Sequence, residues 1–106
     1  MGKAIIKIKD KYFEFSTIVD APVTYGMNEE ELRNYIKDEY GNEGLKNLGD
    51  RLKRVEKNGT SFHGEDLEST LIVNRAGCNE ERLTEDEIYD MYKTPKAYLR
   101  AREKCQ

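Results

Sequence analysis

The N-terminal part of the chain alternates apolar and polar residues with the two-residue period of β-strands. One alternating run covers residues 3–9, with only Ile5 out of phase, and a second run covers residues 12–19. Because only Asp10-Lys11 separates the two runs, we expect an antiparallel hairpin. Pro22 cannot donate a hydrogen bond to a strand ladder, so it predicts the end of the second strand or a sheet edge.

The remainder of the chain has the apolar period of amphipathic helices, together with helix start and stop signals. Asn28 with Glu31 and Thr84 with Glu87 match the capping box, in which two side chains satisfy backbone N–H groups at a helix start. Gly41 is suited to a left-handed helix stop, and Asn58-Gly59 predicts the end of the next helix. We therefore expect helices over about residues 29–40, 43–57, 65–73 and 85–92, and a helical tail over 96–104 that either docks on a partner or frays.

Together these elements predict an α+β fold, in which an N-terminal antiparallel hairpin or small sheet packs with several helices. At 106 residues the chain corresponds to a single ligand-binding domain, residues 1–106, without a linker or an internal repeat. Apolar and charged residues each make up 37% of the composition, so we expect a small core and a heavily ionised surface. Such a chain often gains stability by burying an apolar face against a copy of itself, which predicts a homo-oligomer.

Charge and cysteine content narrow the classes of partner. A net charge of −3 argues against non-specific binding to DNA. Acidic and basic blocks alternate along residues 28–104, which suits pairing between subunits, a local anion pocket or simply solvated helix faces. No apolar run is long enough for a membrane and no signal peptide is recognisable, so we expect a cytoplasmic protein. We expect Cys78 and Cys105 to be reduced thiols, forming neither a disulfide framework nor a metal site.

The sequence shows no recognisable catalytic constellation. The single histidine, His63, has no serine, cysteine or acidic partner at the spacing of a catalytic triad. Acidic clusters at 29–31 and 85–87 fall in first helical turns, where the helix dipole already favours them. No phosphate-binding loop, dinucleotide fingerprint or metal-ligand motif is present. We therefore expect no enzyme and no bound metal or cofactor.

One apolar segment points instead to ligand binding. The stretch 12–27 begins as a strand, in which Phe13 and Phe15 are expected in the core, and continues as a loop carrying Tyr25 and Met27. Loops with exposed aromatic and apolar side chains usually face a ligand or another subunit. This segment therefore favours a binding protein.

A second candidate site lies at a predicted helix end. Asn74 supplies an amide that can read a base or ribose edge, and Arg75 supplies a planar cation suited to phosphate. Phe62 could add a stacking platform, since bases stack on aromatic faces for roughly 1–3 kcal/mol each. An ordinary helix C-terminus explains the same residues equally well.

Three pieces of the chain carry a resemblance to a known family. They are Phe13-Glu14-Phe15-Ser16-Thr17-Ile18-Val19-Asp20-Ala21-Pro22 with Gly26-Met27, Arg51-Leu52-x-Arg54-Val55-Glu56 leading to Gly59-Thr60-Ser61, and Asn74-Arg75-Ala76-Gly77 followed by Leu83-Thr84-x-x-Glu87-Ile88. In order and spacing these pieces resemble the anti-Thoeris sponge proteins, small phage proteins that defeat the bacterial Thoeris defence by sequestering its signal. The tail after Tyr92 lies outside the resemblance.

The resemblance implies binding of cyclic ADP-ribose isomers, the glyco-cyclic forms made by bacterial TIR domains, without cleavage. Some members of the family also bind cyclic oligonucleotides of the CBASS defence at separate sites. The resemblance further implies self-association, as a dimer or as a hexamer built as a trimer of dimers, in the host cytoplasm.

The family's binding residues can be carried over to this chain position by position. The stacking phenylalanine corresponds to Phe62, with His63 as the alternative, and the pocket asparagine corresponds to Asn74. An arginine that serves the cyclic-oligonucleotide site falls at Arg51 or Arg54. With the residues singled out above, the expected ligand-binding set is Phe62, Asn74, Arg75, Tyr25, Met27, Arg51 and Arg54, and no residue is expected to be catalytic.

Two other functions fit the sequence less specifically. The alternating charge blocks and the basic tail suit an inhibitor that covers a host protein and has no small-molecule pocket. The basic segment 46–57 suits a nucleic-acid-binding regulator, although the acidic net charge and the lack of a recognition motif argue against it.

Overall fold

The predicted hairpin forms two strands of a small antiparallel sheet in the computed structural model, which describes residues 2–105. Strand β1 (Lys3–Ile8) pairs along its whole length with β2 (Lys11–Ser16), and the short β3 (Ala21–Pro22) lies beside β2. Pro22 therefore lies in an edge strand, as its missing N–H predicts. The hairpin turn is at Lys9-Asp10, one residue earlier than expected, and Lys9 has a positive φ of 56°.

The second strand ends earlier than the alternating pattern predicts. β2 stops at Ser16 because the chain turns back over residues 17–20 to form β3. The turn is tied to a distant loop, since the backbone N–H of Arg75 donates to the carbonyl of Asp20 over 2.7 Å. Ile18, at the tip of the turn, is 76% exposed.

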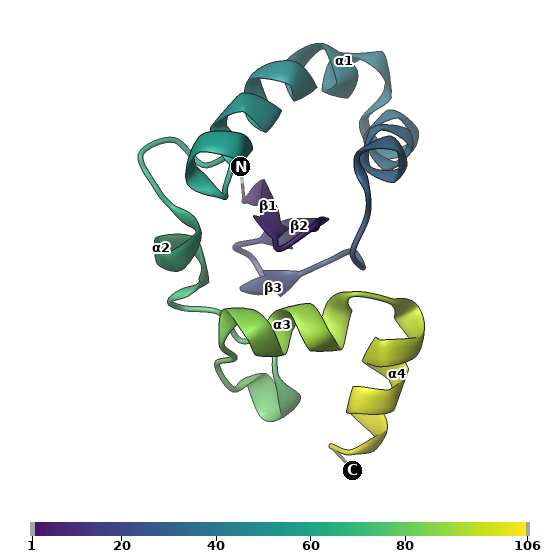
Figure 1. Ribbon diagram of the computed structural model, residues 1–106, viewed down its shortest axis with the longest axis vertical. Helices are drawn as coiled ribbons and strands as arrows, with labels where there is room; N and C mark the ends of the chain where they lie inside the picture. The colour runs from purple at the N-terminus through teal and green to yellow at the C-terminus, as the bar shows by residue number, and fades with distance from the viewer. Residues whose placement is uncertain (1, 106) are drawn as a thin grey trace.

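Among residues 2–105, four α-helices and one short 3₁₀ helix follow the sheet (Figure 1). They are α1 (Glu29–Asn58), α2 (Leu67–Leu71), η1 (Cys78–Glu80), α3 (Glu85–Tyr92) and α4 (Pro95–Glu103). The capping boxes predicted at the starts of α1 and α3 are confirmed. α2 is shorter than the helix predicted over residues 65–73. It begins at Leu67 and ends at Leu71, before the exposed Ile72. No helix in this described range is both long and apolar enough to cross a membrane.

Helix α1 joins the first two predicted helices through a kink. Gly41 has φ 67° and ψ −161°, a backbone conformation outside the helical region, and the helix resumes after it. The predicted stop is therefore a bend, which lets α1 curve over the sheet (Figure 1). Gly59 ends the helix in the left-handed conformation, as predicted for the Asn58-Gly59 pair.

The sheet lies between α1 and α3 (Figure 1). Side chains on both of its faces are buried. One face packs with α2 and α3 in a core of Ile6, Ile8, Phe13, Phe15, Leu71, Ala76, Ile88, Met91 and Tyr92. The other face packs under α1 in a core of Ile5, Tyr12, Leu32, Ile36, Leu48, Leu52 and Val55. Burial on both faces explains why Ile5 departs from simple alternation. The α+β class with an N-terminal hairpin is confirmed.

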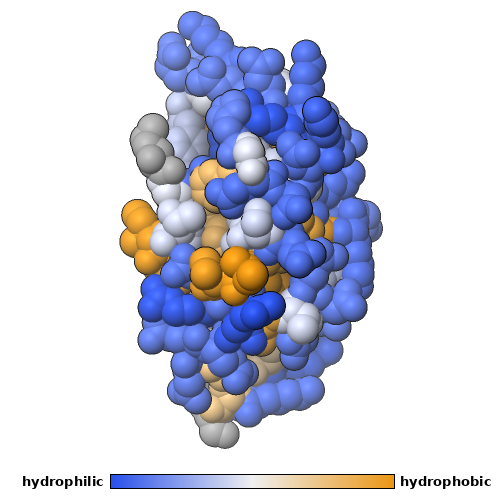
Figure 2. All heavy atoms as spheres, turned by 90° about the vertical axis from the view of Figure 1, so that its left-hand side faces the viewer, coloured by the Kyte–Doolittle hydropathy of each residue, from blue (hydrophilic) through white to orange (hydrophobic). Residues whose placement is uncertain are grey.

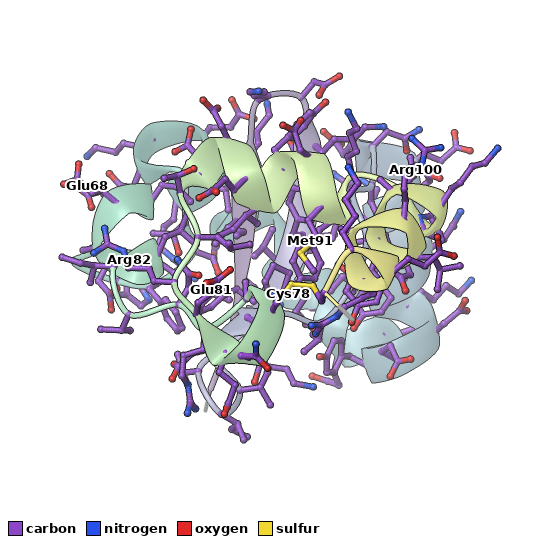
Figure 3. The ribbon with its side chains drawn as sticks, turned by 90° about the horizontal axis from the view of Figure 1, so that it is seen from below. Glu68, Cys78, Glu81, Arg82, Met91 and Arg100 are labelled. Carbon is purple, nitrogen blue, oxygen red and sulfur yellow. A yellow bond between two sulfur atoms is a disulfide. The ribbon has the colours of Figure 1, made fainter. Side chains whose placement is uncertain are left out.

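The C-terminal helix docks on its own chain. Tyr98 in α4 packs against the rings of Tyr25 and Tyr92, with centroids 5.6 and 5.4 Å apart. Cys78 and Cys105 form a disulfide that fastens the end of α4 to η1, with Cα atoms 5.7 Å apart (Figure 3). The expectation of two reduced thiols is therefore wrong for this structure. The pairing joins segments 27 residues apart in sequence, and only the packing of α4 brings them together.

Candidate functional site

A cavity of about 650 Å³ lies where α1 passes the sheet and the loop that follows α1. Three residues predicted from sequence line it: Arg51 and Arg54 from the second half of α1, and Phe62 from the loop. Lys3, Tyr40, Glu43, Asn47 and Ser61 also line it, and Glu14 of β2 reaches it from the sheet. Two guanidinium groups and an aromatic ring therefore share one cavity with the carboxylates of Glu14 and Glu43.

The two arginines are held differently. Arg54 donates from Nε to the carbonyl of Ser61 over 2.8 Å, which ties the helix to the following loop. Arg51 forms no ion pair within residues 2–105. Burial lowers the pKa of the Arg51 guanidinium, and the nearby carboxylate of Glu14 opposes that shift. An anion in the cavity would replace hydration that Arg51 has lost.

The loop after α1 is anchored to the free edge of β1. The backbone N–H of Ser61 donates to the carbonyl of Ile5 over 2.9 Å, and the Ser61 hydroxyl accepts from the Ile5 N–H over 2.9 Å. This anchoring holds the half-buried Phe62 at the cavity. His63, the alternative stacking residue, is exposed and does not line the cavity. The geometry thus selects Phe62 over His63 as the ring available to a ligand there.

Glu14 is the cavity residue that the sequence interpretation missed. Its side chain is 1% exposed, and its two carboxylate oxygens accept hydrogen bonds from Tyr35 over 2.6 Å and Tyr40 over 2.7 Å. Burial and the bond to Glu14 raise the pKa of Tyr40 to about 12 and that of Tyr35 further. Alternation placed Glu14 on a face taken to be polar, and the interruption at Ile5 was the available signal that this face is covered.

Asn74 lies outside the cavity, in the interior of the fold. It is 2% exposed, and its amide donates to the carbonyls of Leu71 and Leu83 over 2.6 and 2.9 Å. Its side-chain oxygen accepts from the N–H groups of Leu83 and Ala76 over 3.0 and 3.3 Å. Both amide atoms are thus used by the backbone, and the side chain ties the loop after α2 to the start of α3.

Two further predicted residues, Tyr25 and Arg75, line a separate cavity of about 410 Å³ beneath α4. Tyr92, Tyr98 and Arg102 complete its aromatic and cationic lining. Arg75 is largely neutralised there, since it pairs with Asp20 over 3.3 Å and Glu80 over 3.4 Å. The structure therefore places five of the seven predicted residues in two separate cavities.

Met27 belongs to neither cavity. Its backbone pairs with Tyr12 through two hydrogen bonds of 2.8 and 2.9 Å, and its side chain packs against the core under α1. Met27 thus pairs with the first part of β2 just before α1 begins. Met27 has a packing role in this structure.

Comparison with known proteins does not assign this chain to a family. The chain matches no protein-family model, no curated protein and no solved structure. Nor do residues 2–105 gather three or more His, Cys, Asp or Glu side chains in a group that could hold a metal ion. The chemistry of the larger cavity must therefore be argued from its own residues.

The larger cavity combines the groups that recognise a nucleotide. Guanidinium forks bind phosphate in a planar, bidentate manner, and an aromatic ring stacks on a base. A volume of about 650 Å³ lies within the range of small-molecule sites. The arrangement can therefore hold an anionic, aromatic molecule of nucleotide size.

Proposed function

We propose that this protein binds a cyclic nucleotide immune signal and sequesters it without cleavage. In this proposal it is a phage-encoded anti-defence protein that holds glyco-cyclic ADP-ribose and so blocks Thoeris immunity. Cyclic di- or trinucleotides of CBASS are further candidate ligands. The observation that carries the proposal is that Arg51, Arg54 and Phe62, all expected from the sequence to bind ligand, line one cavity.

The chemistry of sequestration supports this choice. A molecule that must be kept intact needs stacking and charge-assisted hydrogen bonds, which together give affinity without a nucleophile or a general base. Arg51 has lost hydration through burial, so an anionic ligand gains more from it than from a fully solvated cation. The cavity therefore suits a ligand sink.

An apolar surface supports the proposed self-association as a dimer or a trimer of dimers. Figure 2 shows apolar side chains gathered across the middle of the face that carries α2. Ile72 and Val73, which follow α2 directly, are 52% and 63% exposed, and Ile18, in the turn that Arg75 ties to this region, is 76% exposed. A second copy is a natural cover for such a patch.

The proposed place of action is the host cytoplasm. Thiol systems there keep most cysteines reduced, so the proposed activity must not depend on the Cys78–Cys105 disulfide. A Cys78→Ser, Cys105→Ser double variant is therefore expected to retain ligand as the wild type does.

The proposal is tested by ligand capture. The purified protein is mixed with a glyco-cyclic ADP-ribose isomer and filtered, and the retained molecule is released by heat and identified by mass. Intact ligand is expected from the wild type, with retention lost in Arg51→Ala and Phe62→Ala variants that still fold. A cleaved product would indicate an enzyme, and no retention of either this ligand or a cyclic oligonucleotide would defeat the proposal.

A second candidate function is inhibition of a host protein without a small-molecule pocket. The observation that favours it is the exposure of Ile72 and Val73, two apolar side chains that follow α2 directly. In that case a specific host protein is captured, Ile72→Asp abolishes the capture, and no cyclic nucleotide raises the melting temperature.

A further inference from the structure

Glu14 is an unusual group to find in a cavity proposed to hold a phosphate. Its side chain is 1% exposed, and within residues 2–105 it forms no ion pair with a lysine or arginine. A buried carboxylate costs free energy unless hydrogen bonds satisfy it, and here two tyrosine hydroxyls supply them. Apolar side chains would cover β2 at lower cost, so the carboxylate calls for an explanation beyond packing.

The carboxylate retains unused capacity to accept hydrogen bonds. Its two oxygens offer about four acceptor positions, and Tyr35 and Tyr40 occupy one on each oxygen. The two tyrosines fix the carboxylate from opposite oxygens, and Glu14 still lines the cavity. The remaining acceptor positions have no other hydrogen-bond partner in the described part of the chain, so a donor that reaches the carboxylate from the cavity finds them vacant.

The position of Arg51 indicates which part of a nucleotide would bring that donor. Arg51 lines the same cavity and lies close enough to Glu14 for the two charges to interact. In a nucleotide, the sugar is covalently attached to the phosphate, so a phosphate bound to Arg51 brings ribose hydroxyls into the cavity that Glu14 also lines. Phe62, on the loop after α1, is then left for the base.

We propose that Glu14 is a specificity-determining residue that accepts a hydrogen bond from a ribose hydroxyl of the bound nucleotide. The inference rests on the proposed function and narrows it to ligands with a free ribose hydroxyl beside a phosphate. A site with a buried polar group rejects an analogue that leaves this group unpaired far more strongly than an apolar pocket rejects an added atom. The carboxylate also repels any anionic ligand that offers it no donor.

The test compares the parent ligand with analogues that lack single hydroxyls. Titration calorimetry measures the affinity of the wild type for a glyco-cyclic ADP-ribose isomer and for versions in which each free ribose hydroxyl is singly replaced by hydrogen. We expect one analogue to bind at least about ten-fold more weakly, because hydrogen bonds to charged groups contribute about 1.5–3 kcal/mol. If every analogue binds within about two-fold of the parent, the inference is wrong while the proposed function stands.

Two variants identify Glu14 as the source of the discrimination. In Glu14→Gln the preference for the hydroxyl is expected to shrink to under about three-fold. Glu43→Gln is the matched control, since it removes the same charge from the lining of the same cavity and should keep the preference. Equal preference in wild type and Glu14→Gln would overturn the inference.

The wild-type comparison does not depend on how well a variant folds. Should Glu14→Gln fail to fold, Tyr40→Phe replaces it, because this change removes one of the two hydroxyls that occupy the carboxylate. It is expected to keep or increase the preference for the hydroxyl, and loss of the preference there would count against Glu14. If the wild type binds neither the parent nor any analogue, the proposed function itself fails.

Discussion

The hydroxyl of Tyr35 donates to the buried carboxylate of Glu14 over 2.6 Å and so joins the first half of α1 to the middle of the sheet. On the opposite oxygen, Tyr40 makes the equivalent bond from the residue before the Gly41 kink. One carboxylate thereby holds two points of the bent helix. Glu14 therefore stabilises the kinked helix and also lines the larger cavity.

Tyr35→Phe is expected to lower the free energy of unfolding by about 1.5–3 kcal/mol, because it removes a hydrogen bond to a buried charge. Tyr89→Phe is the matched control. Its hydroxyl donates to Asp10 over 2.8 Å in an exposed pair, so its loss should change stability by no more than about 0.5 kcal/mol. Urea denaturation measures both values, and equal effects would show that burial of Glu14 does not strengthen the bond.

Two glycines in α1 allow the kink to be tested without steric interference. A Cβ added at Gly41 or at Gly49 would meet nothing within 4 Å, and the two sites differ in backbone conformation. Gly41→Ala is expected to cost about 1–3 kcal/mol, because φ 67° with ψ −161° is a region that only glycine adopts readily. Gly49→Ala should stabilise by about 0.5–1 kcal/mol, as expected inside a regular helix. Thermal unfolding measures the change in stability for both variants. If Gly41→Ala stabilises the protein, α1 is straight at this residue.

Asn74→Ala is expected to destabilise the fold by at least about 2 kcal/mol, because it leaves buried backbone groups of the loop without partners. Asn47→Ala makes the same change in the exposed lining of the larger cavity and should alter stability by about 0.5 kcal/mol or less. Urea titration measures the free energy of unfolding of both variants. If Asn74→Ala keeps wild-type stability yet loses ligand, the amide contacts ligand after all.

Stability is expected to fall as the pH rises from about 10 toward 12. Burial raises the pKa of Tyr92 to about 12 from the ordinary 10.0, so the unfolded chain loses this proton first. Below pH 10 both states are protonated and the contribution is complete; above it, each such tyrosine lowers stability by up to about 1.4 kcal/mol per pH unit. Tyr35 and Tyr40 act in the same direction.

Denaturant melts across this pH range measure the slope. Tyr92→Phe is expected to make the decline shallower, although it also loses the hydrogen bond to the Ala76 carbonyl and so lowers stability at neutral pH. An unchanged slope in the variant would show that Tyr92 ionises as it does in an unfolded chain.

Reduction of the Cys78–Cys105 disulfide is expected to cost roughly 3 kcal/mol, since the bond closes a loop of 27 residues. The Cys78→Ser, Cys105→Ser double variant should show the same lower stability with and without reductant. Melting temperature with and without dithiothreitol measures the effect. A wild type that is insensitive to reductant would mean that α4 is held by the tyrosine cluster alone.

Local signals in the sequence predicted much of this fold. The hairpin, both capping boxes and the glycine stop at Gly59 depend on residues a few positions apart, so the pattern alone was sufficient. Arg51 and Arg54, which the resemblance pointed to, line one cavity with Phe62, because the three residues lie within a short stretch of chain. Their role in binding a ligand stays a prediction.

Contacts between distant segments could not be predicted from such local patterns. Nothing near Asn74 in the sequence shows that Leu83 will occupy its amide, and nothing near Cys78 shows that α4 returns to it. Glu14 was missed because strand alternation assigns faces but cannot tell whether a helix covers the second face. In each case the missing information was tertiary packing.

Burial of the sheet on both faces has a consequence for the order in which the protein can fold. The hairpin and α1 leave the ribosome before α3 and can cover the face that carries Ile5 and Tyr12. The opposite face, with Phe13 and Phe15, waits for α3, which ends at Tyr92. A nascent chain therefore exposes an apolar sheet surface until α3 has been synthesised, so burial of this face depends on contacts between segments far apart in the sequence.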